Sequence, residues 1–229
     1  MDIKNEWMKS ISDKLMTAFG NRLLFVGLQG SSQRDEATED SDIDIVTILD
    51  HLTVDDLDQY KSILSTMPEN EKACGFISGK KEIQEWPRHE LFQFSNDTHS
   101  YYGNLDELLP EISRMDIING VKIGASNLYH FCCHSYIYGK KESLKEIYKG
   151  AFFVLQGAYY LRNNIYIKNK EDLMPLLHGV EKQILNISKN WDAYNDDVLS
   201  YPYEHYVILL QWSSGIITEE FIDHERISL

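Results

Sequence analysis

One segment constrains the fold more than any other part of the chain. It spans residues 23–49 and reads LLFVGLQGSSQRDEATEDSDIDIVTIL. The run Leu23–Leu28 is short and apolar, which is typical of a buried strand. Gly30-Ser31 come directly after this run, and a glycine there lets the backbone turn sharply and lets a ligand approach closely. We predict a short helical turn at Ser32–Ala37, because the first N–H groups of a helix lack internal partners and suit a phosphate.

A second strand, Asp42–Leu49, is predicted after this turn. Side chains alternate along a strand, so Asp42, Asp44, Val46 and Ile48 should face the same way. Two carboxylates on one side of a strand repel each other unless a cation lies between them. Oxygen ligands at this spacing suit Mg²⁺, which takes one or two carboxylates and completes its shell with water and substrate phosphate.

Three segments follow one another here: Gly30-Ser31, the spacer Ser32–Ser41 and Asp42-Ile43-Asp44-Ile45. This order resembles the signature of the nucleotidyltransferase superfamily with the DNA polymerase β type of palm. Arg34 and Ala37-Thr38 are similar to positions in the small bacterial branch, which includes aminoglycoside nucleotidyltransferases and minimal nucleotidyltransferases. The resemblance implies a metal-dependent transferase that uses Mg²⁺ and takes ATP, or another nucleoside triphosphate, as its substrate. It implies two groups of site residues: the catalytic and metal-binding Asp42 and Asp44, and the nucleotide-binding Gly30, Ser31 and Arg34.

Composition narrows the class of partner. The chain has 229 residues and a net charge of −14, so it is poor in the Lys and Arg side chains that bind a phosphate backbone. The charge therefore disfavours nucleic acid as a partner and favours a small cationic acceptor. No apolar run is long enough to cross a membrane, and the first residues lack the apolar core of a signal peptide. The odd number of cysteines, three, predicts reduced thiols and a cytoplasmic location, whereas the oligomeric state is not indicated.

The first half of the chain reads as alternating helices and strands around the motif. Apolar residues recur every four positions over residues 3–19, which predicts an amphipathic helix that ends at Gly20. Thr53 and Asp56 form a candidate capping pair for a helix that ends near residue 67. The elements expected next are a strand at 73–78, a helix at 80–86 that ends before Pro87, a strand at 89–94 and a loop at 101–104.

The predicted strand at 89–94 bears on catalysis. In the family resembled, a strand after the Asp-x-Asp hairpin supplies a third carboxylate between two apolar residues. Phe92-Gln93-Phe94 fits that pattern with an amide in place of the acid. An amide orients a ligand but accepts no proton and does not replace an anionic metal ligand. The general base and the third metal ligand are therefore unassigned.

From about residue 113 the apolar period is helical throughout. We predict helices near 113–138, 141–163, 170–190, 203–213 and 216–226, with candidate capping pairs at Ser113 with Asp116 and at Asn169 with Asp172. The predicted fold class is thus α+β: a nucleotidyltransferase mixed sheet with flanking helices at residues 1–112, followed by an all-α helical bundle domain at residues 113–229.

Two further sets of residues allow more than one interpretation. His130 and His134 are four residues apart on a predicted helix, which is compatible with zinc but is more simply a helix face. A basic set on the second bundle helix could reach a triphosphate, although a solvated face is the simpler interpretation; its members are Lys140, Lys141, Lys145, Lys149 and Arg162.

The leading functional prediction is transfer of a nucleoside monophosphate, with AMP as the first candidate, from Mg-NTP to a hydroxyl of a small cationic acceptor such as an aminoglycoside, as in antibiotic resistance. An alternative is a protein- or RNA-modifying minimal nucleotidyltransferase of the antitoxin type. A third interpretation is a catalytically weakened, nucleotide-binding regulator, which the amide of Gln93 would suit.

Overall fold

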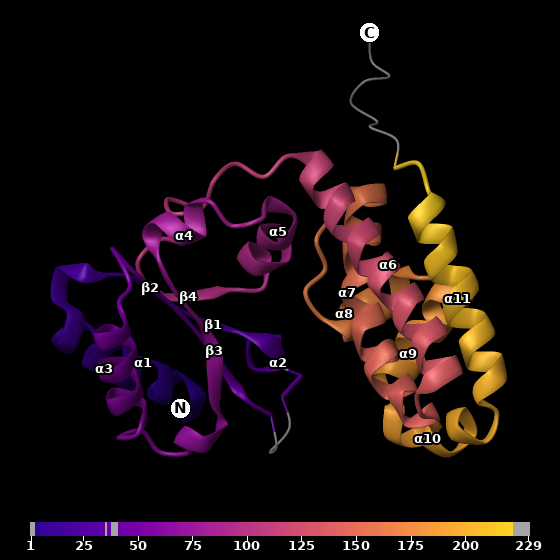
Figure 1. Cartoon of the computed structure of the whole chain (residues 1–229), viewed down its shortest axis with the longest axis horizontal. Helices are drawn as coiled ribbons and strands as arrows, with labels where there is room; N and C mark the ends of the chain where they lie inside the picture. The colour runs from indigo at the N-terminus through magenta and orange to yellow at the C-terminus, as the bar shows by residue number, and fades with distance from the viewer. Residues whose placement is uncertain (1–2, 35, 38–40, 222–229) are drawn as a thin grey trace, which may run out of the picture. The chain divides into compact units, whose positions relative to one another are not determined.

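Four strands form one mixed sheet in the first half of the chain (Figure 1). The computed structural model describes residues 3–34, 36–37 and 41–221, and the chain divides into two compact units, Met1–Ile112 and Ser113–Leu229. The strand order is β3-β2-β1-β4, in which β1 pairs antiparallel with β2 and β4, and β2 pairs parallel with β3. The strands are β1 (Leu23–Gln29), β2 (Ile43–Leu49), β3 (Ala73–Gly79) and β4 (His99–Tyr102).

Helices cover both faces of this sheet. The helices of the first unit are α1 (Ile3–Phe19), α2 (Gly30–Gln33), α3 (Val54–Leu64), α4 (Lys80–Gln84) and α5 (Arg88–Asn96), with 3-10 turns at Gly20–Arg22 and Asn70–Lys72. Ile45 and Leu49 pack with α1 and α3, whereas Val46 and Ile48 pack with α4 and α5. The alternation predicted for the second strand is therefore confirmed, and it directs Asp44 toward the α4 and α5 face.

A capping box and an ion pair stabilise the start of α3. Thr53 and Asp56 form the predicted capping box, in which each accepts a hydrogen bond from the backbone N–H of the other. The Arg22 guanidinium donates to both carboxylate oxygens of Asp56, at 2.8 and 2.9 Å. These bonds hold the pKa of the Asp56 carboxyl well below its usual range. The turn before β1 and the start of α3 are thereby joined.

Two predictions near the end of the first unit are wrong. The segment His89–Phe94, predicted as a strand, belongs to helix α5. The fourth strand is His99–Tyr102, whose last residues were expected in a loop. The short helix after β1 is also earlier than predicted, at Gly30–Gln33 instead of Ser32–Ala37, and Thr38 and Asp40 of the predicted spacer lie outside the described residues.

The second unit is a helical bundle. Helix α6 packs against α7 and α11, and α7, which is buried along much of its length, also packs against α9. The helices of the second unit are α6 (Arg114–Tyr138), α7 (Leu144–Asn163), α8 (Lys170–Leu173), α9 (Gly179–Lys189), α10 (Trp191–Ser200) and α11 (Pro202–Thr218), with 3-10 turns at Lys141–Ser143 and Met174–Leu176. The capping predictions at Ser113 and Asn169 are confirmed.

The later helices differ in extent from the prediction. The helix expected at 170–190 is interrupted by the 3-10 turn that contains Pro175, since a proline removes a backbone donor and disfavours a regular helix before it. Helix α10 was not predicted. One continuous helix, α11, replaces the pair expected at 203–213 and 216–226, and residues 222–226 lie outside the described part of the chain.

Each unit has its own interior and a buried tryptophan. The Trp7 ring N–H donates to the carbonyl of Pro68 at 2.7 Å in the first unit, and the Trp212 ring N–H donates to Glu181 at 3.4 Å in the second. The bundle also contains a buried polar pair, the Tyr148 hydroxyl and Nδ1 of His205, at 2.7 Å. Burial raises the pKa of Tyr148 and lowers that of His205.

Two expectations from composition can be compared with the structure. Cys74, Cys132 and Cys133 are all free thiols. Among the described residues, none of the helices combines the length and the apolar character that a membrane crossing requires.

Candidate active site

The turn that follows β1 brings its backbone against a carboxylate of β2. Gly30 has φ of +73°, in the left-handed region that favours glycine. A Cβ built on Gly30 would overlap Oδ2 of Asp44, so only glycine allows this approach. The neighbouring strand residues agree with the contact, because Gln29, the last residue of β1, pairs with Asp44.

The two candidate metal-binding carboxylates lie at the start of β2. Asp42 directly precedes the strand and is exposed, and Asp44 within it is half-buried. The hydroxyl of Ser32 donates to the backbone carbonyl of Asp42 at 3.3 Å, which fastens α2 to the start of the strand. The turn after β1 and the Asp-x-Asp segment thus form one local structure, and it contains four of the five predicted site residues: Gly30, Ser31, Asp42 and Asp44.

Arg34, the fifth predicted residue, closes the same turn. Its backbone N–H donates to the carbonyl of Gly30 at 3.4 Å. Its side chain lies between two carboxylates, with Nε 3.5 Å from Oε2 of Glu36 and Nη1 3.4 Å from Oδ2 of Asp97. The side chains of Arg34 and Asp97 are each only 9% exposed. The guanidinium therefore has its charge balanced inside the protein, next to the turn.

Residues at the end of α5 form hydrogen bonds with Gln29, the residue before the turn. The Gln29 side-chain amide donates to the carbonyl of Phe94 at 3.1 Å and to the hydroxyl of Thr98 at 2.6 Å. Asp97 is the C-cap residue of α5, and its N–H donates to the carbonyl of Gln93 at 2.8 Å. We did not predict these contacts from the sequence. The one local signal for them is Gln29, a polar residue at the end of an apolar strand.

The interpretation of Gln93 as a strand residue is wrong. Gln93 lies on helix α5, and the next strand along the chain that pairs with β2 is β3, in which Cys74 pairs with Asp44. Ala73 of β3 packs on the α1 face and Phe76 on the opposite face, so strand alternation places Cys74 on the same face as Asp44. The sheet neighbours of Asp44 are thus an amide, Gln29, and a thiol, Cys74.

The donor set fits a hard divalent cation that is completed by substrate. Among the residues that the structure describes, no three or more His, Cys, Asp or Glu side chains gather in an arrangement that could hold a metal ion. Asp42 and Asp44 would supply the two carboxylates that Mg²⁺ commonly takes from protein, and water and phosphate oxygens would fill its other positions.

The other candidate sets belong to the helices of the second unit. His130 and His134 are exposed neighbours on α6, with ring centroids 6.2 Å apart. Arg162 donates to Glu181 at 2.9 Å and to Glu219 at 2.6 Å, so it fastens helices of the bundle to each other. Lys141 donates to the carbonyl of Leu199 at 2.8 Å.

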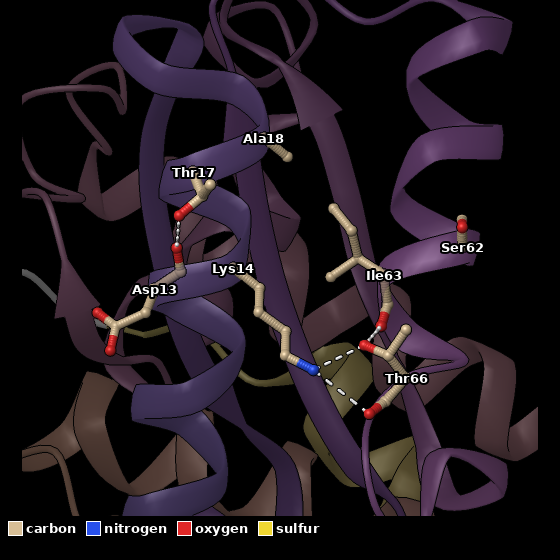
Figure 2. Close-up of a pocket in the computed structure, with 7 residues that line it drawn as sticks. All are labelled: Asp13, Lys14, Thr17, Ala18, Ser62, Ile63 and Thr66. Atoms are coloured by element: carbon tan, nitrogen blue, oxygen red, sulfur yellow. Dashed lines mark hydrogen bonds between the residues drawn. The ribbon is translucent and has the colours of Figure 1, made fainter.

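An open hollow of about 370 Å³ lies between α1 and α3 (Figure 2). The Lys14 ammonium crosses it and donates to the hydroxyl of Thr66 at 2.7 Å and to its carbonyl at 3.3 Å. Since α1 and α3 cover the sheet face opposite to that of Asp44, this hollow does not include the carboxylate site.

Comparisons with known proteins concern the family of the first unit and the fold of the chain. Residues 8–93 match the family model described as a nucleotidyltransferase domain. A comparison with curated protein sequences gives no match. Among solved structures, the chain is similar to spectinomycin adenyltransferase AAD(9) from Enterococcus faecialis, determined with ATP and spectinomycin. The TM-score is 0.56 at 14% sequence identity, over 93% of this chain and 99% of that one, and at this identity the likeness shows the fold.

Proposed function

Residues 8–93 belong to the nucleotidyltransferase superfamily, and from this premise we propose that the chain transfers a nucleoside monophosphate to a hydroxyl of a small cationic acceptor. AMP from ATP is the leading donor group, and an amino-sugar of the aminoglycoside type is the leading acceptor. The observation that carries the proposal is the contact between the Gly30 backbone and the Asp44 carboxylate. This contact supports the proposal that the turn binds phosphate next to a carboxylate that binds the metal ion.

The residues of the site have distinct roles in this proposal. Mg²⁺ held by Asp42 and Asp44 would supply the positive charge that a triphosphate requires. The backbone of Gly30-Ser31 and the Ser31 hydroxyl bind the β- and γ-phosphates, and Arg34 offsets charge on the leaving group. The acceptor oxygen bonds to the α-phosphorus, the bond from that phosphorus to the bridging oxygen breaks, pyrophosphate leaves, and the hydroxyl proton is released.

Two observations support a small cationic acceptor: the net charge of the chain and the ligands of one structural neighbour. A chain of net charge −14 attracts cations and repels polyanions before any specific contact forms. The neighbour AAD(9) was solved with ATP and spectinomycin, which supports a nucleotide and a small molecule as the two substrates. A cytoplasmic location, where ATP is available, fits three free thiols.

A pyrophosphate-release screen tests the proposal. Each nucleoside triphosphate is combined with Mg²⁺ and with an aminoglycoside, a neutral disaccharide or a transfer RNA. We expect release with ATP and an amino-sugar, with acceptor affinity that falls as salt rises from about 0.05 to 0.3 M, because the Debye length shrinks over that range. Preferential binding of the RNA, or no salt-dependent binding of any amino-sugar, would instead favour a minimal nucleotidyltransferase that modifies a protein or an RNA.

Variants of the two carboxylates serve as the catalytic control. Asp42→Asn and Asp44→Asn each remove one negative charge that the metal site needs, so each should abolish pyrophosphate release while circular dichroism and melting stay close to wild type. Turnover near the wild-type rate in either variant would show that the site is elsewhere.

A second function, a nucleotide-binding regulator without transfer activity, is favoured by a specific observation. The strand position opposite Asp44 is Cys74, and the Gln93 amide lies on a helix, so neither supplies a third carboxylate. Calorimetry separates the two functions. Binding of Mg-ATP without pyrophosphate release for any acceptor would support the regulator.

A further inference from the structure

Arg34 and Asp97 form an ion pair that is largely removed from water. Nη1 of Arg34 and Oδ2 of Asp97 are 3.4 Å apart, and each side chain is 9% exposed. A charge in such a position is costly unless its partner is present, so removing one member of the pair has a larger effect than at the surface. Arg34 is therefore sensitive to what happens at Asp97.

Asp97 is itself firmly placed. It caps the C-terminus of α5 through its backbone, and its neighbour Thr98 accepts a hydrogen bond from Gln29 at 2.6 Å. Gln29 directly precedes the Gly30 turn, and Arg34 directly follows α2. The end of α5 thus holds the residue before the turn through Thr98 and the residue after it through Asp97.

We propose that Asp97 is a positioning residue, which holds the Arg34 guanidinium beside the Gly30-Ser31 turn and thereby sets the affinity of the site for the β- and γ-phosphates of a nucleoside triphosphate. This inference rests on the proposed function. Asp97 acts through Arg34 and need not touch the nucleotide. Without the Asp97 carboxylate, the guanidinium keeps Glu36, whose Oε2 is 3.5 Å from Nε, but it loses the counter-charge held at the end of α5 and moves away from the turn.

The test is a double-mutant cycle with Asp97→Asn, Arg34→Gln and both together, measured by calorimetry with Mg-ATP and with AMP. We expect Arg34→Gln to weaken Mg-ATP binding about tenfold or more, because a hydrogen bond to a charged group is lost. Asp97→Asn should weaken Mg-ATP binding several-fold. In the Arg34→Gln background, Asp97→Asn should have no further effect. AMP has no β- or γ-phosphate, so its affinity should be the same in all four proteins.

A matched control is Asp58→Asn, which makes the same change of charge at an exposed position of α3. It should leave both affinities unchanged, which excludes an effect of net charge. Asp97→Glu, which keeps the carboxylate, should recover most of the Mg-ATP affinity. If Asp97→Asn alone fails to fold, the comparison of Arg34→Gln with the double variant carries the test, since in the double variant neither member of the Arg34–Asp97 pair remains as a charge opposite a neutral side chain.

Three results would overturn the inference. Equal losses of Mg-ATP affinity with and without Arg34 would show that Asp97 acts on its own. Equal losses for Mg-ATP and AMP would show a merely structural role. A gain of affinity in Asp97→Asn would show that Asp97 competes with phosphate for Arg34. If the wild-type protein binds no nucleoside triphosphate, the proposed function fails and the inference fails with it, whereas binding that is insensitive to Asp97 overturns the inference alone.

Discussion

Replacing Gly30 with alanine separates the backbone cost of the turn from its role in the site. Gly30 has φ of +73°, and an alanine in the left-handed region costs about 1–2 kcal/mol. In a unit of roughly 100 residues, each kcal/mol lowers Tm by roughly 4–8 °C. In addition, the new Cβ would overlap Oδ2 of Asp44, so the carboxylate has to move. We therefore expect a moderate loss of stability and a large loss of Mg-ATP binding.

Gly20→Ala is the matched control. Gly20 lies in the same unit with φ of +54°, and no atom lies within 4 Å of the position that its Cβ would take. Its alanine variant should pay the same backbone cost of about 1–2 kcal/mol without disturbing any carboxylate. The two variants therefore match in stability and differ in the site.

Urea unfolding and calorimetry with Mg-ATP provide the assay. Both variants should lose similar unfolding free energy, and Gly20→Ala should bind Mg-ATP as the wild type does. Gly30→Ala should bind Mg-ATP at least about tenfold more weakly, since the proposed metal ligand Asp44 is displaced. The reasoning is refuted if Gly30→Ala matches Gly20→Ala in both measurements. The turn would then serve the fold alone.

Two further predictions concern a thiol and an imidazole. Cys74 pairs with Asp44 in the sheet, so bound Mg-ATP should slow alkylation of the Cys74 thiol by iodoacetamide several-fold. Mass spectrometry measures this rate, with Cys133 as the reference thiol. Equal alkylation rates of Cys74 with and without Mg-ATP would contradict this placement. Burial lowers the pKa of His205 in the folded protein, so on acidification the unfolded chain takes up a proton at this residue before the folded chain does. The free energy of unfolding should therefore fall as pH drops through about 6.5, with a slope of at most about 1.4 kcal/mol per pH unit. Equilibrium unfolding between about pH 8 and 5 measures this fall, and His205→Gln should flatten it.

The strands around the motif could be predicted because several local signals agree there. The apolar run before Gly30 and the alternation after Asp42 specify strand, turn and strand independently of the rest of the chain. The capping pairs at Thr53 and Ser113 were predicted for the same reason, since a cap involves residues only three positions apart.

The segment His89–Phe94 shows where local signals are insufficient. Over six residues, the alternation of a strand and the period of a helix are hard to separate. The helix is favoured by packing, because the adjacent residues Leu91 and Phe92 are both buried, which a strand with one solvated face does not allow. The proline at position 87 also suits a helix start, since its φ is fixed near helical values.

The partners of the site residues could not be predicted from the sequence. The pairing of Cys74 with Asp44 depends on the register of two strands that are joined through α3, and register is set by the whole sheet. The contact between Arg34 and Asp97 spans 63 positions of the chain. The motif thus identifies the candidate groups, whereas their neighbours follow from tertiary packing.

The separate interiors of the two units have a practical consequence for fluorescence. Trp7 and Trp212 are each 6% exposed, one in each unit, and each ring N–H has a hydrogen-bond partner. With the other two tryptophans, Trp86 and Trp191, replaced by phenylalanine, red-shifted emission from Trp7 or Trp212 would report the opening of one core at a time. Chains with more than one core often do not unfold in a single step. A weakened turn at Gly30 should then shift the transition seen by Trp7 and leave that of Trp212 in place.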